Sequence, residues 1–111
     1  MNLQAIQNEL QNAGLDGWLM FDHHHRDPLA YRVLGFTPPD HVSRRWYYFI
    51  PARGEPRGLV HRVEPRILDT LPGEKIPYSR WQEQHSGLRQ ILQDAKTVAG
   101  LPHEWWARRS N

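Results

Sequence analysis

Apolar residues recur at helical spacing in two stretches of this sequence. The first stretch holds Leu3, Ile6, Leu10 and Ala13. This spacing predicts an amphipathic helix of about three turns, which Gly14 ends. The second stretch opens with a predicted capping box, Ser79-Arg80-Trp81-Gln82, and then repeats along one face through Trp81, His85, Leu88 and Leu92. It predicts a longer helix that ends near Ala95.

Shorter apolar runs predict strands between these helices. Residues 17–22 form a nearly continuous apolar run, as in a strand that is buried on both faces. Residues 45–50 place aromatic side chains on both faces and predict a central strand. Residues 58–63 follow a turn rich in Pro and Gly, which predicts an antiparallel hairpin. Brief strands are predicted at residues 75–78 and 97–99.

Two prolines predict two further short helices. Pro28 suits the first turn of a helix through Leu34, and Pro65 suits the start of a helix through Leu71. The resulting order is helix, strand, helix, hairpin, helix, strand, helix, strand. This order predicts an α/β fold with three α/β/α layers around a mixed sheet of about five strands.

Composition restricts the classes of protein that fit. The chain has 111 residues, of which 39% are hydrophobic and 23% charged, as in one globular domain and not in a disordered chain. It contains no cysteine, which excludes disulfides and thiolate metal sites and leaves a cytoplasmic protein as the expectation. The sequence has no apolar run long enough to span a bilayer and no signal-peptide pattern at its start, so we expect no membrane partner.

The charges are mixed along the chain. Fourteen Lys and Arg face twelve Asp and Glu, for a net charge of +2. The arginines occur singly or in pairs, such as Arg44-Arg45 and Arg108-Arg109, and not in a block that could neutralise a row of phosphates. We therefore expect no nucleic-acid partner.

Several phrases occur in an order that resembles the N-terminal domain of the creatinase, prolidase and Xaa-Pro aminopeptidase family. They are Leu15-Asp16-Gly17-Trp18-Leu19, Asp27-Pro28-Leu29-Ala30, Arg44 to Pro51, Leu59-Val60-His61, Leu71 to Lys75, and Tyr78-Ser79-Arg80-Trp81. No phrase is a catalytic signature, so the specificity lies in their order and spacing. The resemblance covers roughly residues 3 to 100, and we expect a creatinase N-terminal-like domain over residues 1–100 and a divergent C-terminal tail over residues 101–111.

The resemblance implies a ribonuclease H-like α/β domain that performs no chemistry itself. In that family the domain precedes a pita-bread catalytic domain whose two Asp, one His and two Glu hold a pair of divalent metals in the peptidases. None of that set has a counterpart here, so the resemblance implies no catalytic residue, no metal ligand and no cofactor. It also implies a role in dimerisation, with contacts to the active site of the partner subunit.

A run of three histidines follows the first predicted strand. His23 and His25 would point the same way in an extended chain, and neutral imidazoles bind Zn²⁺, Ni²⁺ or Cu²⁺ weakly. The surrounding residues match no zinc-site spacing. A small His-rich metal-binding protein is therefore kept only as the alternative hypothesis. The loop follows the carboxyl end of a strand, where α/β sheets bind ligands. We therefore assign substrate or partner contact to His23, His24, His25 and Arg26.

Other residues with chemical potential have simpler interpretations. His61 lies between apolar neighbours, which favours a hydrogen-bonded, partly buried side chain over a catalytic base. The sequence contains no Gly-x-Ser-x-Gly and no phosphate-binding Gly-rich loop. The aromatic residues 46–49 resemble a base-stacking platform, but covering helices favour their burial. Trp81 and His85, one helical turn apart, are interpreted as packing residues.

Near the end of the chain, Trp105 and Trp106 fall outside any regular pattern. Adjacent side chains diverge, so at least one should meet a partner subunit or fold back on the sheet, and we assign both as interface candidates. Taken together, the sequence predicts a non-catalytic interaction domain that forms a homodimer. A separate catalytic domain, whose substrate pocket this chain completes, is the second expected partner.

Overall fold

The computed structural model describes residues 1–22, 28–35 and 44–100 of the chain. Its elements follow the order α1 (Leu3–Asn12), β1 (Gly17–Asp22), α2 (Pro28–Leu34), β2 (Trp46–Pro51), β3 (Arg57–His61), β4 (Glu74–Tyr78), α3 (Trp81–Leu92) and β5 (Val98–Ala99). In this part of the chain no helix is long and apolar enough to cross a membrane.

The strands form one five-stranded mixed sheet in the order β4-β3-β2-β1-β5. Strand β2 is antiparallel to both β1 and β3, whereas β4 runs parallel to β3 and β5 runs parallel to β1. Every strand except β2 therefore points the same way. The predicted hairpin and the central position of residues 46–50 are confirmed, and all six residues of β2 are buried.

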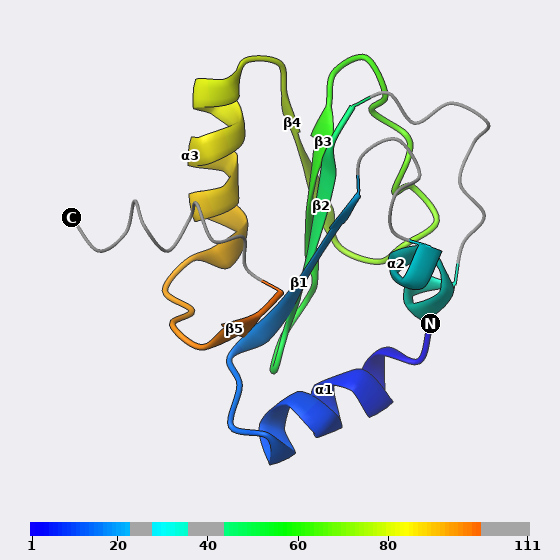
Figure 1. Cartoon of the computed structure of the whole chain (residues 1–111), viewed down its shortest axis with the longest axis vertical. Helices are drawn as coiled ribbons and strands as arrows, with labels where there is room; N and C mark the ends of the chain where they lie inside the picture. Colours follow the sequence, from blue (N-terminus) through cyan, green and yellow to red (C-terminus); the bar gives the residue numbers. More distant parts are fainter. Residues whose placement is uncertain (23–27, 36–43, 101–111) are drawn as a thin grey trace.

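Helices cover both faces of the sheet (Figure 1), which confirms the predicted three-layer α/β fold. On one face α1 and α2 pack against residues such as Met20, Trp46 and Tyr48. On the other face α3 packs against Leu19, Tyr47 and Phe49. Successive strand residues thus enter opposite cores, which is why these strands are apolar at almost every position. The aromatic residues of β2 are core, as predicted, and not a base-stacking platform.

The predicted helix over residues 65–71 is wrong. Residues 62–71 form successive turns. Two of these turns are closed by hydrogen bonds between residues three apart, from Asp69 N to the Arg66 carbonyl (3.1 Å) and from Leu71 N to the Leu68 carbonyl (3.0 Å). Leu68 and Leu71 still enter the core beside α1 and α2. These apolar residues are buried in a series of turns, because the flanking prolines and the short length of the segment do not support a regular helix.

The start of α3 is one residue later than predicted. The side chain that accepts backbone hydrogen bonds there belongs to Glu83 and not to Gln82, and its Oε1 atom accepts from the amide of Arg80 at 3.0 Å. Helix α3 packs closely on the sheet at Gly87, where a Cβ atom would lie only 2.5 Å from a Leu59 methyl group. The helix is rotated so that Leu88, Ile91 and Leu92 are buried, whereas Trp81 is 66% exposed. Trp81 therefore lies outside the core, although it shares the predicted helical face with Leu88 and Leu92.

Candidate functional site

The carboxyl ends of β1, β3 and β4 lie at the same edge of the sheet. Their last residues are Asp22, His61 and Tyr78, and the antiparallel strand β2 begins at this edge with Trp46. Ligands of open α/β sheets bind outside the carboxyl ends of the strands. This edge is therefore the candidate functional site.

A buried hydrogen-bond network anchors the end of β1. The Asp22 carboxylate, 2% exposed, accepts a short hydrogen bond from the Tyr31 hydroxyl of α2. The Tyr31 oxygen in turn accepts a hydrogen bond from Trp46 Nε1 at 3.2 Å. Burial, reinforced by the bond to Asp22, raises the pKa of the Tyr31 hydroxyl. The network joins β1, α2 and β2 at the residue directly before His23.

A second set of contacts orders the neighbouring strand ends. The Tyr78 hydroxyl donates to the carbonyl of Arg45, and burial raises the pKa of this hydroxyl. The His61 ring packs edge-on against the Tyr78 ring, with centroids 5.1 Å apart, and its Nδ1 atom accepts from the amide of Val63 at 3.0 Å. His61 is half-buried and hydrogen-bonded, as predicted from its neighbours in the sequence.

These groups border a hollow of about 530 Å³, which we call the carboxyl-edge surface. It is lined by Arg44, Arg45, His61, Tyr78, Ser79, Trp81 and Gln84. Arg44, Arg45 and Trp81 are all exposed. A fork-shaped guanidinium recognises carboxylates well, and an exposed tryptophan beside arginines is typical of binding surfaces. The arrangement can hold an anionic or aromatic group.

The amino end of α3 at this surface is already occupied by Glu83. Its Oε1 atom accepts hydrogen bonds from the Ser79 hydroxyl (2.7 Å), the Ser79 amide (3.2 Å) and the Arg80 amide (3.0 Å). The bond from the Ser79 hydroxyl, followed by that from the Arg80 amide, lowers the pKa of Glu83. The helix start therefore stabilises an internal carboxylate, and the exposed cations of this surface are the side chains of Arg44 and Arg45.

The residues assigned from the sequence as contacts lie outside the described residues. These are His23, His24, His25, Arg26, Trp105 and Trp106. Among the described residues, no group of three or more His, Asp or Glu side chains comes together as a metal site would require. The hypothesis of a His-rich metal-binding protein thus has no support in the described part of the chain.

Sequence reasoning missed the contribution of Arg44, Arg45 and Trp81 to this edge. A signal was present for the arginines, because they lie at the start of the strand predicted over residues 45–50, which was predicted to form an antiparallel hairpin with residues 58–63. The amino end of such a strand must lie beside the carboxyl ends of the others. No comparable signal was present for Trp81, whose exposure depends on the rotation of α3.

The sequence matches no known family pattern and no curated protein. Solved structures do match. A proline dipeptidase from Streptococcus pneumoniae is 26% identical, with a TM-score of 0.64 over 96% of this chain and 80% of that chain. The creatinase/prolidase N-terminal domain of an X-Pro dipeptidase from Streptococcus pyogenes is 18% identical, with a TM-score of 0.66 over 95% of this chain and 82% of that chain. This chain has the fold of a creatinase/prolidase N-terminal domain.

A prolidase from Thermococcus sibiricus has the same fold over part of its length. It is 15% identical, with a TM-score of 0.71 over 97% of this chain but only 30% of that chain. The present chain thus spans less than a third of that prolidase. The resemblance found in the sequence phrases is confirmed at the level of the fold, including its extent over nearly the whole chain.

Proposed function

We propose that this chain is a non-catalytic domain of a prolidase-like hydrolase. In this proposal it pairs with a second copy, and its carboxyl-edge surface borders the substrate pocket of a catalytic domain. The observation that carries the proposal is the similarity of its fold, over 95% of the chain, to a solved creatinase/prolidase N-terminal domain of an X-Pro dipeptidase. The substrate class that follows is a dipeptide with proline in second place.

The chemistry of the carboxyl-edge surface supports this role. Arg44 and Arg45 offer guanidinium groups to a peptide carboxylate, and Trp81 offers an apolar plate. The Tyr78 hydroxyl and the His61 Nδ1 atom are used in internal hydrogen bonds. A surface of this kind suits binding and positioning better than proton transfer, which needs an acid or base that can reach the substrate.

The dimer is tested by the mass of the chain in solution. Sedimentation equilibrium at about 50 µM should give twice the mass of one chain, and the fraction of dimer should fall on dilution. A mass equal to one chain at that concentration would contradict the dimer.

The contribution to a substrate pocket is tested in a chimera. This chain replaces the matching part of the T. sibiricus prolidase, and cleavage of an X-Pro dipeptide is measured. The double variant Arg44→Glu, Arg45→Glu should lower kcat/KM at least about tenfold, because it repels the substrate carboxylate. The matched control is Arg66→Glu, an exposed arginine that does not line this surface. Equal activity of the double variant and the control would overturn this role.

A further inference from the structure

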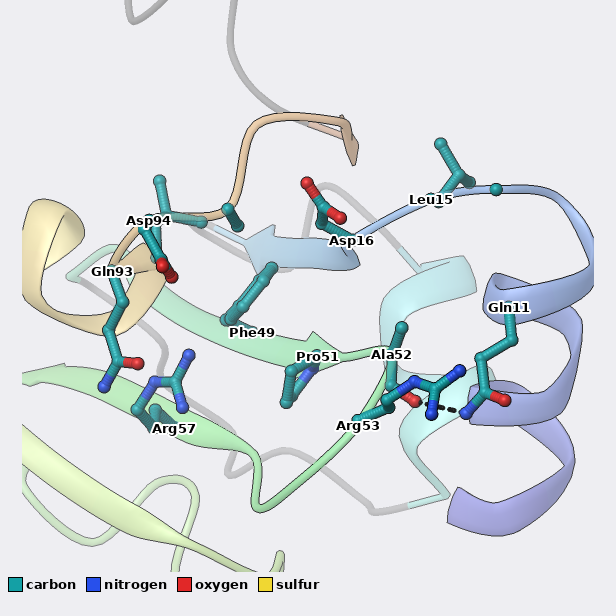
Figure 2. Close-up of a pocket in the computed structure, with 13 residues that line it drawn as sticks. Gln11, Leu15, Asp16, Phe49, Pro51, Ala52, Arg53, Arg57, Gln93 and Asp94 are labelled. Atoms are coloured by element: carbon teal, nitrogen blue, oxygen red, sulfur yellow. Dashed lines mark hydrogen bonds between the residues drawn. The ribbon is translucent and has the colours of Figure 1, made fainter.

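A second cleft lies at the opposite edge of the sheet, where β1 and β3 begin and β2 and α3 end (Figure 2). Its volume is about 530 Å³, within the range of small-molecule sites. Arg57 is the first residue of β3 and His61 its last, so β3 separates this cleft from the carboxyl-edge surface. The proposed function makes no use of this cleft.

Arg57 is held in a fixed position in the cleft. Its Nε atom donates to the Ile91 carbonyl in the last turn of α3 at 2.7 Å, and its guanidinium carbon lies 5.5 Å from the centroid of the Phe49 ring. Within the described residues, its two Nη nitrogens have no hydrogen-bond partner. Burial lowers the pKa of Arg57, although a guanidinium remains charged at neutral pH. The cleft thus contains an oriented, partly desolvated cation.

Two carboxylates line the same cleft. Asp16 Oδ2 accepts from the amides of Lys96 (2.8 Å) and Thr97 (3.0 Å), and these bonds lower the pKa of Asp16. Asp94 lies beside Arg57 and Gln93 on one side of the cleft, with Arg53 and Gln11 on the other side and Phe49 between them (Figure 2). The lining therefore presents charges of both signs around an aromatic ring.

No two of these opposite charges lie within ion-pair distance, although the nearby Asp94 carboxylate partly offsets the lowering of the Arg57 pKa by burial. In the part of the chain that the structure describes, the one ion pair within 4.0 Å is Arg66–Asp69, on the exposed turn before β4. Neither Asp16 nor Asp94 forms such a pair with Arg53 or Arg57. A cleft that keeps opposite charges apart is suited to a ligand that carries both signs itself, and less suited to a polyanion such as phosphate.

The backbone at the rim of the cleft is strained. Gln93 has φ 51° and ψ −124°, and among the described residues it is the one non-glycine residue with positive φ. It takes the first central position of a type II′ turn, closed by the Ala95 amide and the Leu92 carbonyl at 3.0 Å. Glycine is the preferred residue there. Backbone strain of this kind clusters at ligand sites. Here the strained turn places Gln93 and Asp94 at the rim of the cleft.

We propose that this cleft binds a small zwitterion, namely an α-amino acid or a dipeptide. The carboxylate lies on the Nη atoms of Arg57, the ammonium group lies on the Asp94 carboxylate, and the apolar body rests against Phe49. Each charge of the ligand then pairs with an opposite charge of the protein, Arg57 or Asp94.

The test is a titration of the full chain with L-leucine, followed by backbone amide NMR. Saturable shifts should centre on residues 93–95. N-acetyl-leucine lacks the ammonium group and leucinamide lacks the carboxylate, so each should bind at least about tenfold more weakly, or about 1.4 kcal/mol. Equal binding of either analogue, tighter binding of inorganic phosphate, or no saturation at about 10 mM leucine would overturn the proposal.

Variants locate the two charged contacts. Asp94→Asn should weaken leucine binding about tenfold, and Asp69→Asn, on an exposed turn, should leave it unchanged. Arg57→Lys keeps the positive charge but removes the forked guanidinium, so it should weaken leucine binding by a similar factor. The control is Arg89→Lys at an exposed position, which should leave the affinity unchanged. If Arg57→Lys does not fold because it loses the hydrogen bond to Ile91, the comparison of Asp94→Asn with Asp69→Asn is the test. Asp94→Asn should fold, because the Asp94 side chain is exposed. An unchanged affinity in Asp94→Asn would overturn the proposal, whatever the outcome of the dimer experiment.

Discussion

The polar groups at the two ends of the strands differ in their hydrogen bonding. We call the end at which β1 and β3 begin the amino edge, and the end at which they finish the carboxyl edge. At the carboxyl edge, hydrogen bonds within the chain engage the buried groups, as in the contacts of Asp22 with Tyr31 and of Tyr78 with Arg45. At the amino edge, the Nη atoms of Arg57 and the Asp94 carboxylate face a cleft without forming an ion pair, among the residues described. The first arrangement stabilises the fold, whereas the second leaves charges for a ligand. Internal hydrogen bonding thus distinguishes the buried polar groups that stabilise the fold from the partly buried or exposed charges that remain available to a ligand.

The largest expected effect comes from breaking the buried network at the carboxyl edge. Asp22→Ala leaves the Tyr31 hydroxyl buried without its carboxylate acceptor, and should lower the free energy of unfolding by about 3 kcal/mol. Urea denaturation measures this value. The control, Asp69→Ala, removes an exposed ion pair and should change it by less than about 0.5 kcal/mol. A loss below about 1 kcal/mol in Asp22→Ala would show that this network is not a main source of stability.

A smaller loss is expected where the amino edge is tightly packed. A Cβ atom at Gly17 would lie 2.3 Å from the Phe49 ring and 2.9 Å from the Ile50 carbonyl oxygen. Gly17→Ala should therefore cost about 2 kcal/mol and displace Phe49, whose ring lies between the two sides of the cleft. The same titration with leucine should then give a weaker affinity. Wild-type stability in this variant would mean that the ring moves freely and is not a fixed wall.

Relief of the strained turn should raise stability. Gln93→Gly places the preferred residue at φ 51°, and the gain from lost strain exceeds the extra entropy of glycine in the unfolded chain, so unfolding should require about 1 kcal/mol more. The matched control is Gln90→Gly in α3, which should cost about 1 kcal/mol because glycine weakens a helix interior. In thermal denaturation, the Tm of Gln93→Gly should rise and the Tm of Gln90→Gly should fall. A downward shift for both would contradict the strain.

The smallest effect concerns acid stability at the two edges. The pKa values of Asp16 and Glu83 are both lowered in the folded chain by hydrogen bonds to their ionised forms. A depressed pKa stabilises the fold above the pKa of the unfolded chain, and this contribution is lost as the pH falls through the folded value. Asp16→Asn and Glu83→Gln should each flatten the loss of stability below pH about 5. Urea midpoints measured between neutral and acidic pH give the slopes, and unchanged slopes would contradict the assignment.

Much of the fold follows from local patterns. Continuous apolar runs identified β1 and β2 as doubly covered strands because each successive side chain enters a different core. Gly14 and Gly35 marked helix ends at which the backbone has φ of 71° and 72°. The error at residues 65–71 has the same physical origin. An apolar spacing reports which side chains are buried, and it does not distinguish a helix from a series of turns.

The candidate sites depend on contacts between residues far apart in the sequence. The apolar pattern placed His61 within a strand predicted over residues 58–63, whereas β3 ends at His61, and Arg45 reaches it only through the antiparallel register of β2 with β3. Arg57 and Asp94 share a cleft because α3 ends over β3. Neither pair has a sequence spacing that predicts its meeting.

The sequence alone determined the class of fold, the buried strands and the absence of cysteine chemistry, because these depend on composition and on the period of apolar residues along the chain. Only the tertiary structure decided which polar groups pair and which face a cavity. The reason is physical: the period of a strand or helix assigns a side chain to a face, whereas the partner of a charge depends on strand register and on the rotation of the covering helix. Trp81 is the simplest case, since it fits the predicted helical face and is nevertheless 66% exposed.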